Sequence, residues 1–351
     1  MLGTDARVAR AAWTVLLIAG SLILLWLLRD LLFLLTVALF FSYMLSPVVG
    51  LVERYLPKNL PMGSFAKEMP LVVVYLAMLG AIAGAGFWIG ANALEQATRL
   101  SAKLPELLAN RESLMRYPLP EWAEPARAAI LEYARGLLEG GFEKLWPHLQ
   151  DLSRRLLSGL GSAALFLLVP IFAFYFLKDG IAISNAIINR FPADQRSTVG
   201  GIFGDLHRLL SQYIRSLALI SVATFVAYEG FFLIVGVPYS TLLATLAAVL
   251  EVIPVVGPLT AAITALAVAG FSGYSGLAGM VIFFVAYRLF TDYVLQPFLM
   301  SSGVAVHPLA VLAGLLAGEQ LAGIPGLVLS IPLIAAFRVI YLRLENPHFG
   351  K

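Results

Sequence analysis

The feature that most constrains this chain is a set of uncharged, strongly apolar runs. Four of them fall at residues 11–28, 31–52, 69–94 and 156–177. An α-helix rises about 1.5 Å per residue, so about 20 residues cross a hydrocarbon core about 30 Å thick. Each run is therefore about long enough to cross a membrane, and the sequence predicts at least four transmembrane helices.

Composition supports the same class of protein. Of the 351 residues, 60% are hydrophobic and 13% are charged, about half the charged share of an ordinary soluble domain. A soluble globule cannot bury that much apolar surface. The predicted fold is an all-α integral membrane protein with about eight hydrophobic segments, some of them broken or re-entrant, and with amphipathic interfacial helices.

The charged residues divide the chain into three parts. Residues 1–91 contain three transmembrane spans, residues 92–155 form an amphipathic extramembrane helical region, and residues 156–345 form a core of broken and re-entrant helices. Along residues 131–156, apolar residues recur largely at alternating spacings of four and three, which is typical of a helix with one apolar seam. This seam packs either within the same chain or against another subunit. A second amphipathic helix, residues 199–213, is expected along the cytoplasmic interface.

Basic residues in the short flanks indicate the orientation, because cytoplasmic flanks are enriched in Lys and Arg. They are Arg7, Arg10, Arg54, Lys58, Lys67, Lys178, Arg190, Arg196, Arg208, Arg338, Arg343 and Lys351. We expect a multi-pass protein of a bacterial inner membrane, with both termini in the cytoplasm and residues 92–155 outside.

Enzyme and metal-site signatures are missing from the sequence. It has no cysteine, which excludes disulfides, thiolate metal sites and a cysteine nucleophile. Its four histidines are widely separated, and it contains no His-Glu-x-x-His, Gly-x-Ser-x-Gly or Walker loop. The net charge of +3 is small and spread out, so it does not indicate nucleic acid binding. We expect neither an enzyme nor a bound cofactor.

The most informative region is the apolar block of residues 238–337, which prolines and glycines interrupt repeatedly. Its prolines are Pro238, Pro254, Pro258, Pro297, Pro308, Pro325 and Pro332. Two of them lie four residues apart with Gly257 between, and they favour a turn flanked by apolar segments too short for a full crossing. The sequence predicts a re-entrant hairpin in which residues 239–253 enter the bilayer and residues 259–271 leave on the same side.

A turn at membrane depth needs protein or water around it, because each freed backbone N–H or C=O group costs several kcal/mol in lipid. Transporters use broken helices of this kind to present helix ends to a solute or ion. The turn at residues 254–258 therefore marks a cavity or a solute route. Further breaks at residues 296–308 and 323–326 could form the matching half of such a site.

The motifs of this block resemble those of a known family. They are Glu251-Val-Ile-Pro254-Val-Val-Gly257-Pro258, then Asp292-Tyr-Val-Leu-Gln296-Pro297, then His307-Pro308, then Gly318-Glu319 before Gly323 and Gly326, and finally Pro332, with Phe174-Tyr-Phe-Leu-Lys-Asp179 closing the fourth span. In order and spacing they resemble the AI-2E family of transporters over about residues 8–343. The Glu-x-Ile-Pro-x-x-Gly-Pro element is the specific one.

The resemblance implies secondary transport of a small solute or ion. Family members are associated with export of the signal autoinducer-2 or with Na⁺/H⁺ antiport, so coupling to H⁺ or Na⁺ is expected. The resemblance also implies a homo-oligomer, with a pentamer as the form to test first, and elevator-like alternating access of the broken-helix block. One departure is Asp292, where the family usually carries Glu, which shortens the side chain by one methylene.

Charged side chains in the block are costly in lipid and are the candidates for function. Glu251 could bind a cation, take a proton or cap the next helical segment. Arg288 and Asp292, four residues apart on one helical face, are expected to pair, either as a structural contact or as a solute gate. His307 is either a protonation switch or a histidine held by a backbone carbonyl.

Two further glutamates lie in this part of the chain. Glu319 serves either proton coupling or a buried hydrogen bond, whereas Glu229 is expected to bond a Ser, Thr or Tyr of another helix. The predicted solute or ion pathway consists of Glu251, Pro254, Gly257, Pro258, Arg288, Asp292, Gln296, His307 and Glu319.

Two other classes of function fit the same sequence. A non-transporting membrane scaffold or assembly factor would use the seam in residues 92–155 to hold partners. A passive channel would enclose a pore within an oligomer, although broken helices beside charges suit alternating access better. The polar residues are too few to distinguish a polyhydroxylated signal molecule from Na⁺ or H⁺.

Overall fold

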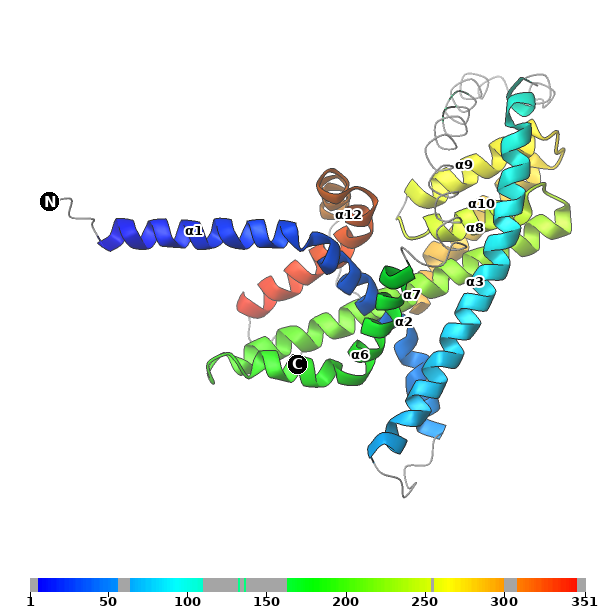
Figure 1. Cartoon of the computed structure of the whole chain (residues 1–351). Helices are drawn as coiled ribbons and strands as arrows, with labels where there is room; N and C mark the ends of the chain where they lie inside the picture. Colours follow the sequence, from blue (N-terminus) through cyan, green and yellow to red (C-terminus); the bar gives the residue numbers. More distant parts are fainter. Residues whose placement is uncertain are drawn as a thin grey trace.

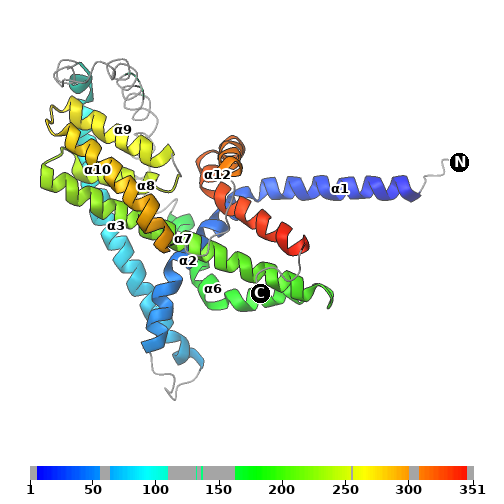
Figure 2. The same ribbon diagram turned by 180° about the vertical axis from the view of Figure 1, so that it is seen from behind.

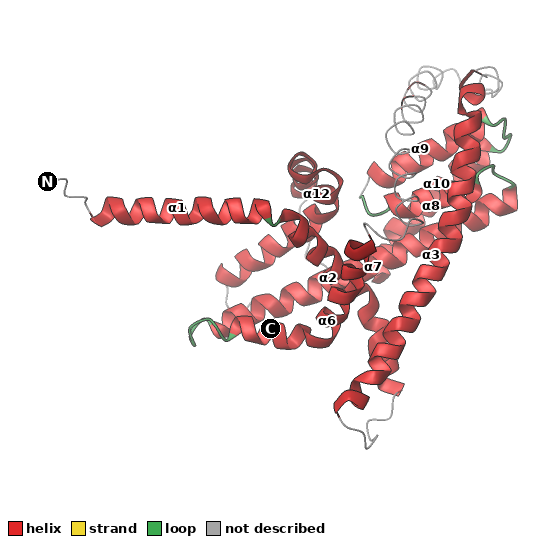
Figure 3. Cartoon of the chain, viewed as in Figure 1, coloured by secondary structure: helices red, strands yellow, loops and turns green. Residues whose placement is uncertain are grey.

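The computed structural model describes residues 6–55, 64–109, 132, 136, 163–253, 256–299 and 308–345. Within these ranges every regular element is helical and no strand occurs (Figure 3). Six stretches are long and apolar enough to cross a membrane: Arg29–Gly50, Val72–Lys103, Leu167–Ile188, Arg196–Val235, Leu277–Leu299 and Gly326–Glu345. Shorter apolar helices accompany them. The predicted all-α membrane class is therefore confirmed.

The first helix stands apart from the others (Figures 1 and 2). Helix α1 (Ala6–Leu27) is joined to α2 (Arg29–Tyr55) through Leu28, across which the helical hydrogen bonds continue from Leu24 to Leu32. Helix α2 packs against the later helices α6 and α7, whereas the apolar side chains of α1 are mostly exposed. Lipid or another subunit is the natural environment for such a surface.

Helix α3 (Ser64–Ala109) is longer than a bilayer is thick. Its 46 residues correspond to a rod of about 70 Å at 1.5 Å per residue. The predicted boundary between residues 91 and 92 thus falls inside one continuous helix, so the division between span and extramembrane region is not a break in the backbone. Most of the apolar seam predicted for residues 131–156 lies outside the described residues.

Helices α6 (Ala163–Ile188) and α7 (Arg196–Val235) follow. The amphipathic helix predicted at residues 199–213 is present as the first half of α7, which continues without interruption into the apolar span. It is not a separate element because no glycine or proline follows Gly204 until Gly230. Helix α7 ends at Gly236, whose φ of 73° gives the left-handed C-cap that glycine adopts readily.

The predicted pair of short helices is present after α7. Helices α8 (Ser240–Leu250) and α9 (Val256–Phe271) pack against each other. At 1.5 Å per residue, their 11 and 16 residues give lengths of about 16 and 24 Å, each below the 30 Å of a hydrocarbon core. Helix α10 (Leu277–Phe290), the π-helical turn η2 (Thr291–Leu295) and α11 (Gln296–Leu299) complete this group.

Aromatic and small residues hold the group together. Tyr228 and Phe232 of α7 pack on Phe284 of α10, and the rings of Phe231 and Phe283 stack with centroids 4.0 Å apart. Buried alanines line α8 and α9, namely Ala244, Ala247, Ala261, Ala265 and Ala269, and small side chains of this kind allow close helix packing in membranes. The result is a packed core that fixes the ends of α8, α9 and α10.

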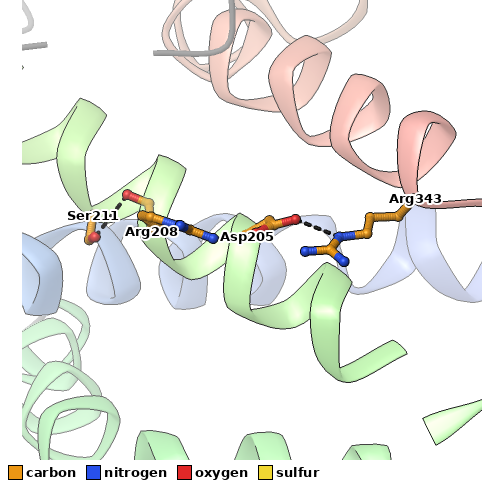
Figure 4. Close-up of polar contacts among 4 residues, drawn as sticks. All are labelled: Asp205, Arg208, Ser211 and Arg343. Carbon is orange, nitrogen blue, oxygen red and sulfur yellow. Dashed lines mark hydrogen bonds and ion pairs between the residues drawn. The ribbon is translucent and has the colours of Figure 1, made fainter. Parts of the chain in front are cut away.

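The last helix, α12 (Pro308–Glu345), is broken at Gly323, where φ is 62° and ψ is −140°. This confirms the break predicted at residues 323–326. The two halves touch through glycines: a Cβ on Gly326 would meet the carbonyl of Gly318. Near the end of α12, Arg343 Nε donates to Asp205 Oδ2 of α7 over 2.7 Å (Figure 4).

Candidate functional site

Glu251 lies at the C-terminal end of α8, where the chain turns toward α9. Its backbone N–H donates to the carbonyl of Ala247, so it still belongs to the last turn of the helix. A Cβ added to Gly257, at the start of α9, would collide with the carbonyl oxygen of Leu250. Glycine is needed there because the beginning of α9 lies directly against the end of α8. This close approach explains the glycine of the Glu-x-Ile-Pro-x-x-Gly-Pro element.

Arg288 and Asp292 form the predicted pair. Arg288 Nε donates to Asp292 Oδ2 over 2.9 Å, and Arg288 Nη2 lies 2.8 Å from Oδ1. The pair spans the junction of α10 with η2, and π-helical turns of this kind occur frequently at functional sites. Gln296 Nε2 also donates to Asp292 Oδ1, over 3.4 Å. The carboxylate of Asp292 therefore receives donors from two residues on its own helical segment.

Arg288 also connects this segment to the hairpin. Its Nη1 lies 3.7 Å from Oε1 of Glu251. The Glu251 side chain is 8% exposed, whereas those of Arg288 and Asp292 are each 37% exposed. Two carboxylates thus share one guanidinium, which leaves a net charge of −1. Glu251 is both the more buried and the more weakly paired of the two carboxylates.

A cavity of about 480 Å³ opens beside these charges. It is lined mainly by apolar side chains of α9 and α10, and its polar lining comes from Glu251, Arg288, Tyr228, Tyr287 and Thr291. Pro258 also lines it. A mostly apolar cavity with a few convergent polar groups is the usual form of a small-molecule site.

The structure brings together five of the predicted pathway residues around this cavity and its charges: Glu251, Pro258, Arg288, Asp292 and Gln296, with Gly257 buried at the hairpin turn. Pro254 and His307 lie outside the described residues. Glu319 is exposed on the first half of α12, which lies away from α9 and α10 in both views (Figures 1 and 2). Glu319 is not among the residues that line the cavity, and the place in the pathway that the sequence suggested for it is untested.

Glu229 makes the kind of contact expected of it. Thr241 Oγ1 of α8 donates to Glu229 Oε1 of α7 over 2.8 Å. Next to it, Gln96 Oε1 of α3 accepts a hydrogen bond from the backbone N–H of Leu242. These two contacts fix the N-terminal end of α8, at the opposite end of that helix from Glu251.

The aromatic hydroxyls at the cavity were not among the residues predicted from the sequence. Tyr228 and Tyr287 line it, and the Tyr287 hydroxyl lies 3.0 Å from Thr224 Oγ1. A signal was present, because Thr224 and Tyr228 are four residues apart on one face of an otherwise apolar span. Among the described residues, no cluster of three or more His, Cys, Asp or Glu side chains is arranged to hold a metal ion.

A family model and several known proteins match this chain over most of its length. The family model described as AI-2E family transporter matches residues 14–346. The candidate transport protein YrrI of Bacillus subtilis is 26% identical over 90% of this chain and 87% of its own length. The candidate transport protein YueF of the same organism is 24% identical over 86% and 81%. The candidate permease PerM of Escherichia coli K12 is 27% identical over 86% and 87%.

Proposed function

The chain belongs to the AI-2E family of transporters, and on that premise we propose that it is a secondary transporter whose solute or ion pathway passes the cavity beside Glu251. It is a multi-pass membrane protein with a role in membrane transport. We further propose which ion is coupled to transport, where it binds and which helices move.

One observation carries this proposal, namely the sharing of one guanidinium by two carboxylates at a helix break. Unpaired charge is costly in a low-dielectric membrane interior, and an imperfectly paired buried carboxylate is costlier than a well-paired one. Asp292 is fully engaged by Arg288, whereas the Glu251 carboxylate lies 3.7 Å from the guanidinium. Binding of H⁺ or Na⁺ at Glu251 would remove the excess negative charge, so Glu251 is the proposed coupling residue.

The location of Glu251 suggests how ion binding reaches the rest of the protein. The residue lies at the junction of two short helices, and the ion pair with Arg288 ties that junction to α10. Neutralising Glu251 weakens this tie and allows the α8–α9 hairpin to move relative to α10. We propose that this movement opens the solute route and accompanies an elevator-like movement of the whole broken-helix block, with Asp292 holding Arg288 in place throughout.

The volume and the lining of the cavity limit the kind of solute that can bind there. Its volume of about 480 Å³ lies within the range of about 300–1,000 Å³ that is common for small-molecule sites. Tyrosine hydroxyls and charged groups are available at one end and an apolar surface at the other. Export of autoinducer-2 and Na⁺/H⁺ exchange are the first two activities to test.

We also propose how the chain assembles and how it is oriented in the membrane. Large exposed apolar side chains on α1, such as those of Trp13 and Trp26, support contact with lipid or with other subunits of a homo-oligomer, with a pentamer as the first form to test. The basic flanks support cytoplasmic termini in a bacterial inner membrane.

The experiment is flux into proteoliposomes that contain the purified protein, under imposed H⁺ or Na⁺ gradients and with a panel of solutes that includes autoinducer-2. Flux that follows one of the gradients supports a secondary transporter. Gradient-independent single-channel currents would instead identify a channel, and no flux together with a stable hetero-complex would identify a scaffold. Glu95→Gln is the control for Glu251→Gln, because Glu95 is an exposed partner of Arg99 on α3.

A further inference from the structure

A second cavity, of about 430 Å³, lies on the first half of α7, away from the charges at Glu251. It is lined by Arg208, Ser211, Gln212, Arg215, Ser216 and Leu219, together with Leu299 at the end of α11. Arg208 and Arg215 are seven residues apart, so both lie on the same face of the helix. Unlike the first cavity, this one contains two cationic side chains and no carboxylate in its lining.

The charges around this cavity are not balanced. Asp205 interacts with Arg208 and also accepts a hydrogen bond from Arg343 Nε over 2.7 Å (Figure 4). Among the described residues in these contacts and in the lining, Arg208, Arg215 and Arg343 carry positive charge and Asp205 carries negative charge. The Arg208 side chain is 64% exposed despite its contact with Asp205, so it can donate to a further anion.

Arg215 supplies the more specific donor. Among the described residues, its buried Nε–H has no hydrogen-bond partner, and its Nη2 makes a long contact of 3.4 Å with Ser46 Oγ of α2. A buried donor without a partner costs free energy unless a ligand or water accepts from it. An arginine with free donors at a membrane-facing pocket fits an oxygen anion, because a guanidinium matches phosphate with two parallel hydrogen bonds.

An apolar stripe continues from the pocket along α7. Leu219, Val222 and Val226 follow Arg215 at helical spacing, and their side chains are 53%, 61% and 63% exposed. The basic pocket is thus located where the charged half of α7 meets its apolar part, and we infer that this point lies near the lipid headgroups. A ligand with an anionic head and a long apolar tail would match both parts of this surface.

We propose that this pocket binds the phosphate of an anionic phospholipid, with Arg208 and Arg215 as donors and the stripe at Leu219, Val222 and Val226 against an acyl chain. Ser216 Oγ, at the base of the pocket, donates to the carbonyl of Leu299 over 2.9 Å. The bound lipid would therefore lie across the contact between α7 and the end of α11.

The test is native mass spectrometry of the full-length protein in neutral detergent, titrated with phosphatidylglycerol, phosphatidylcholine or inorganic phosphate. We expect phosphatidylglycerol to bind best, and the Arg208→Gln/Arg215→Gln double variant to bind it about tenfold or more weakly, since charge-assisted hydrogen bonds are lost. Arg208→Gln and Arg99→Gln each remove one arginine charge, so Arg99→Gln on α3 is the control for the single variant, with unchanged binding.

Arg215→Lys keeps the positive charge and removes the planar guanidinium, so it separates loss of the site from loss of the fold. We expect it to show the elution profile of the parent and weakened binding of phosphatidylglycerol. Equal binding of the two lipids would overturn the proposal, as would parental binding by the double variant. Displacement of the lipid by inorganic phosphate at the same concentration would assign the site to the free anion and would also overturn it.

Discussion

The break between α8 and α9 and the break inside α12 both occur at residues that disfavour helix, yet their surroundings differ. At the first break, a buried glutamate meets an arginine that is already paired with an aspartate. At the second, two glycine backbones lie in direct contact, and a Cβ on either Gly318 or Gly326 would collide with the carbonyl of the other. Ser330, nearby, donates within its own helix to Leu327 O.

A helix break in a membrane therefore does not by itself mark a solute route. Non-helical backbone can be satisfied by close packing of protein or by polar groups around a cavity. Close packing of glycines accounts for the α12 break, whereas the α8–α9 break combines close packing at Gly257 with polar groups around a cavity. We therefore propose a structural role for the break at Gly323 and a functional role for the break at Glu251, and substitutions can test both roles.

The largest effect is expected from Arg288→Met. This substitution leaves Glu251 and Asp292 close together without their shared cation, which we expect to cost about 3 kcal/mol, the lower end for a broken buried pair because Arg288 is partly exposed. Unfolding of the purified protein in detergent measures the loss. The control Arg99→Met breaks an exposed pair on α3 and should cost less than about 1 kcal/mol. Equal losses would mean that the charges at Glu251 contribute no more than surface charges.

The next effect is expected from Gly326→Ala, at the other break. The added methyl group would overlap the backbone of Gly318, and overpacking of this kind costs about 1–3 kcal/mol. We expect a lower unfolding temperature, measured by the loss of the monodisperse peak in size-exclusion chromatography after heating. Gly80→Ala is the control, since a Cβ at Gly80 meets no atom within 4 Å. If both variants unfold at the same temperature as the parent, the contact between Gly318 and Gly326 does not stabilise the broken helix α12.

A smaller effect is expected from Thr241→Val, which removes the donor to Glu229 Oε1 at the other end of α8. Loss of one hydrogen bond to a partly buried carboxylate costs about 1–2 kcal/mol. The matching change near the α12 break, Ser330→Ala, removes only a bond to its own helix and should cost less than about 0.5 kcal/mol. Chemical denaturation of the two variants provides the comparison. A larger loss of unfolding free energy for Ser330→Ala would mean that polar contacts stabilise the α12 break more than they stabilise the α8–α9 region.

Much of the fold could be predicted from the sequence because its signals are local. Charge-free runs predicted three of the six spans, at residues 31–52, 69–94 and 156–177, whereas the run at 11–28 corresponds to a shorter apolar helix. Prolines and glycines predicted the breaks, and a spacing of four predicted the pair Arg288–Asp292. The length of α3 was not recognised, since a change in composition near residue 92 does not interrupt a helix. The continuity of α7 was missed for the same reason, because polarity changes along it while the backbone does not.

The site was predicted in part. Glu251 and Arg288 were identified separately, but nothing in one sequence indicates that their side chains lie 3.7 Å apart, because that contact depends on the packing of α7 through α10. The tyrosines at the cavity and the arginine pocket on α7 depend on the same long-range packing. Glu319 looked equivalent to Glu251 in the sequence, since both lie in apolar surroundings beside a break.

Comparing Glu251→Gln with Glu319→Gln in proteoliposomes under one imposed ion gradient tests whether Glu251 is the residue that couples transport to the ion. Both substitutions remove a carboxylate beside a helix break and keep the size of the side chain. We expect Glu251→Gln to abolish gradient-driven flux, with the fold intact by size-exclusion chromatography, and Glu319→Gln to retain the flux of the parent. Parental flux in Glu251→Gln, or loss of flux in Glu319→Gln alone, would contradict this expectation.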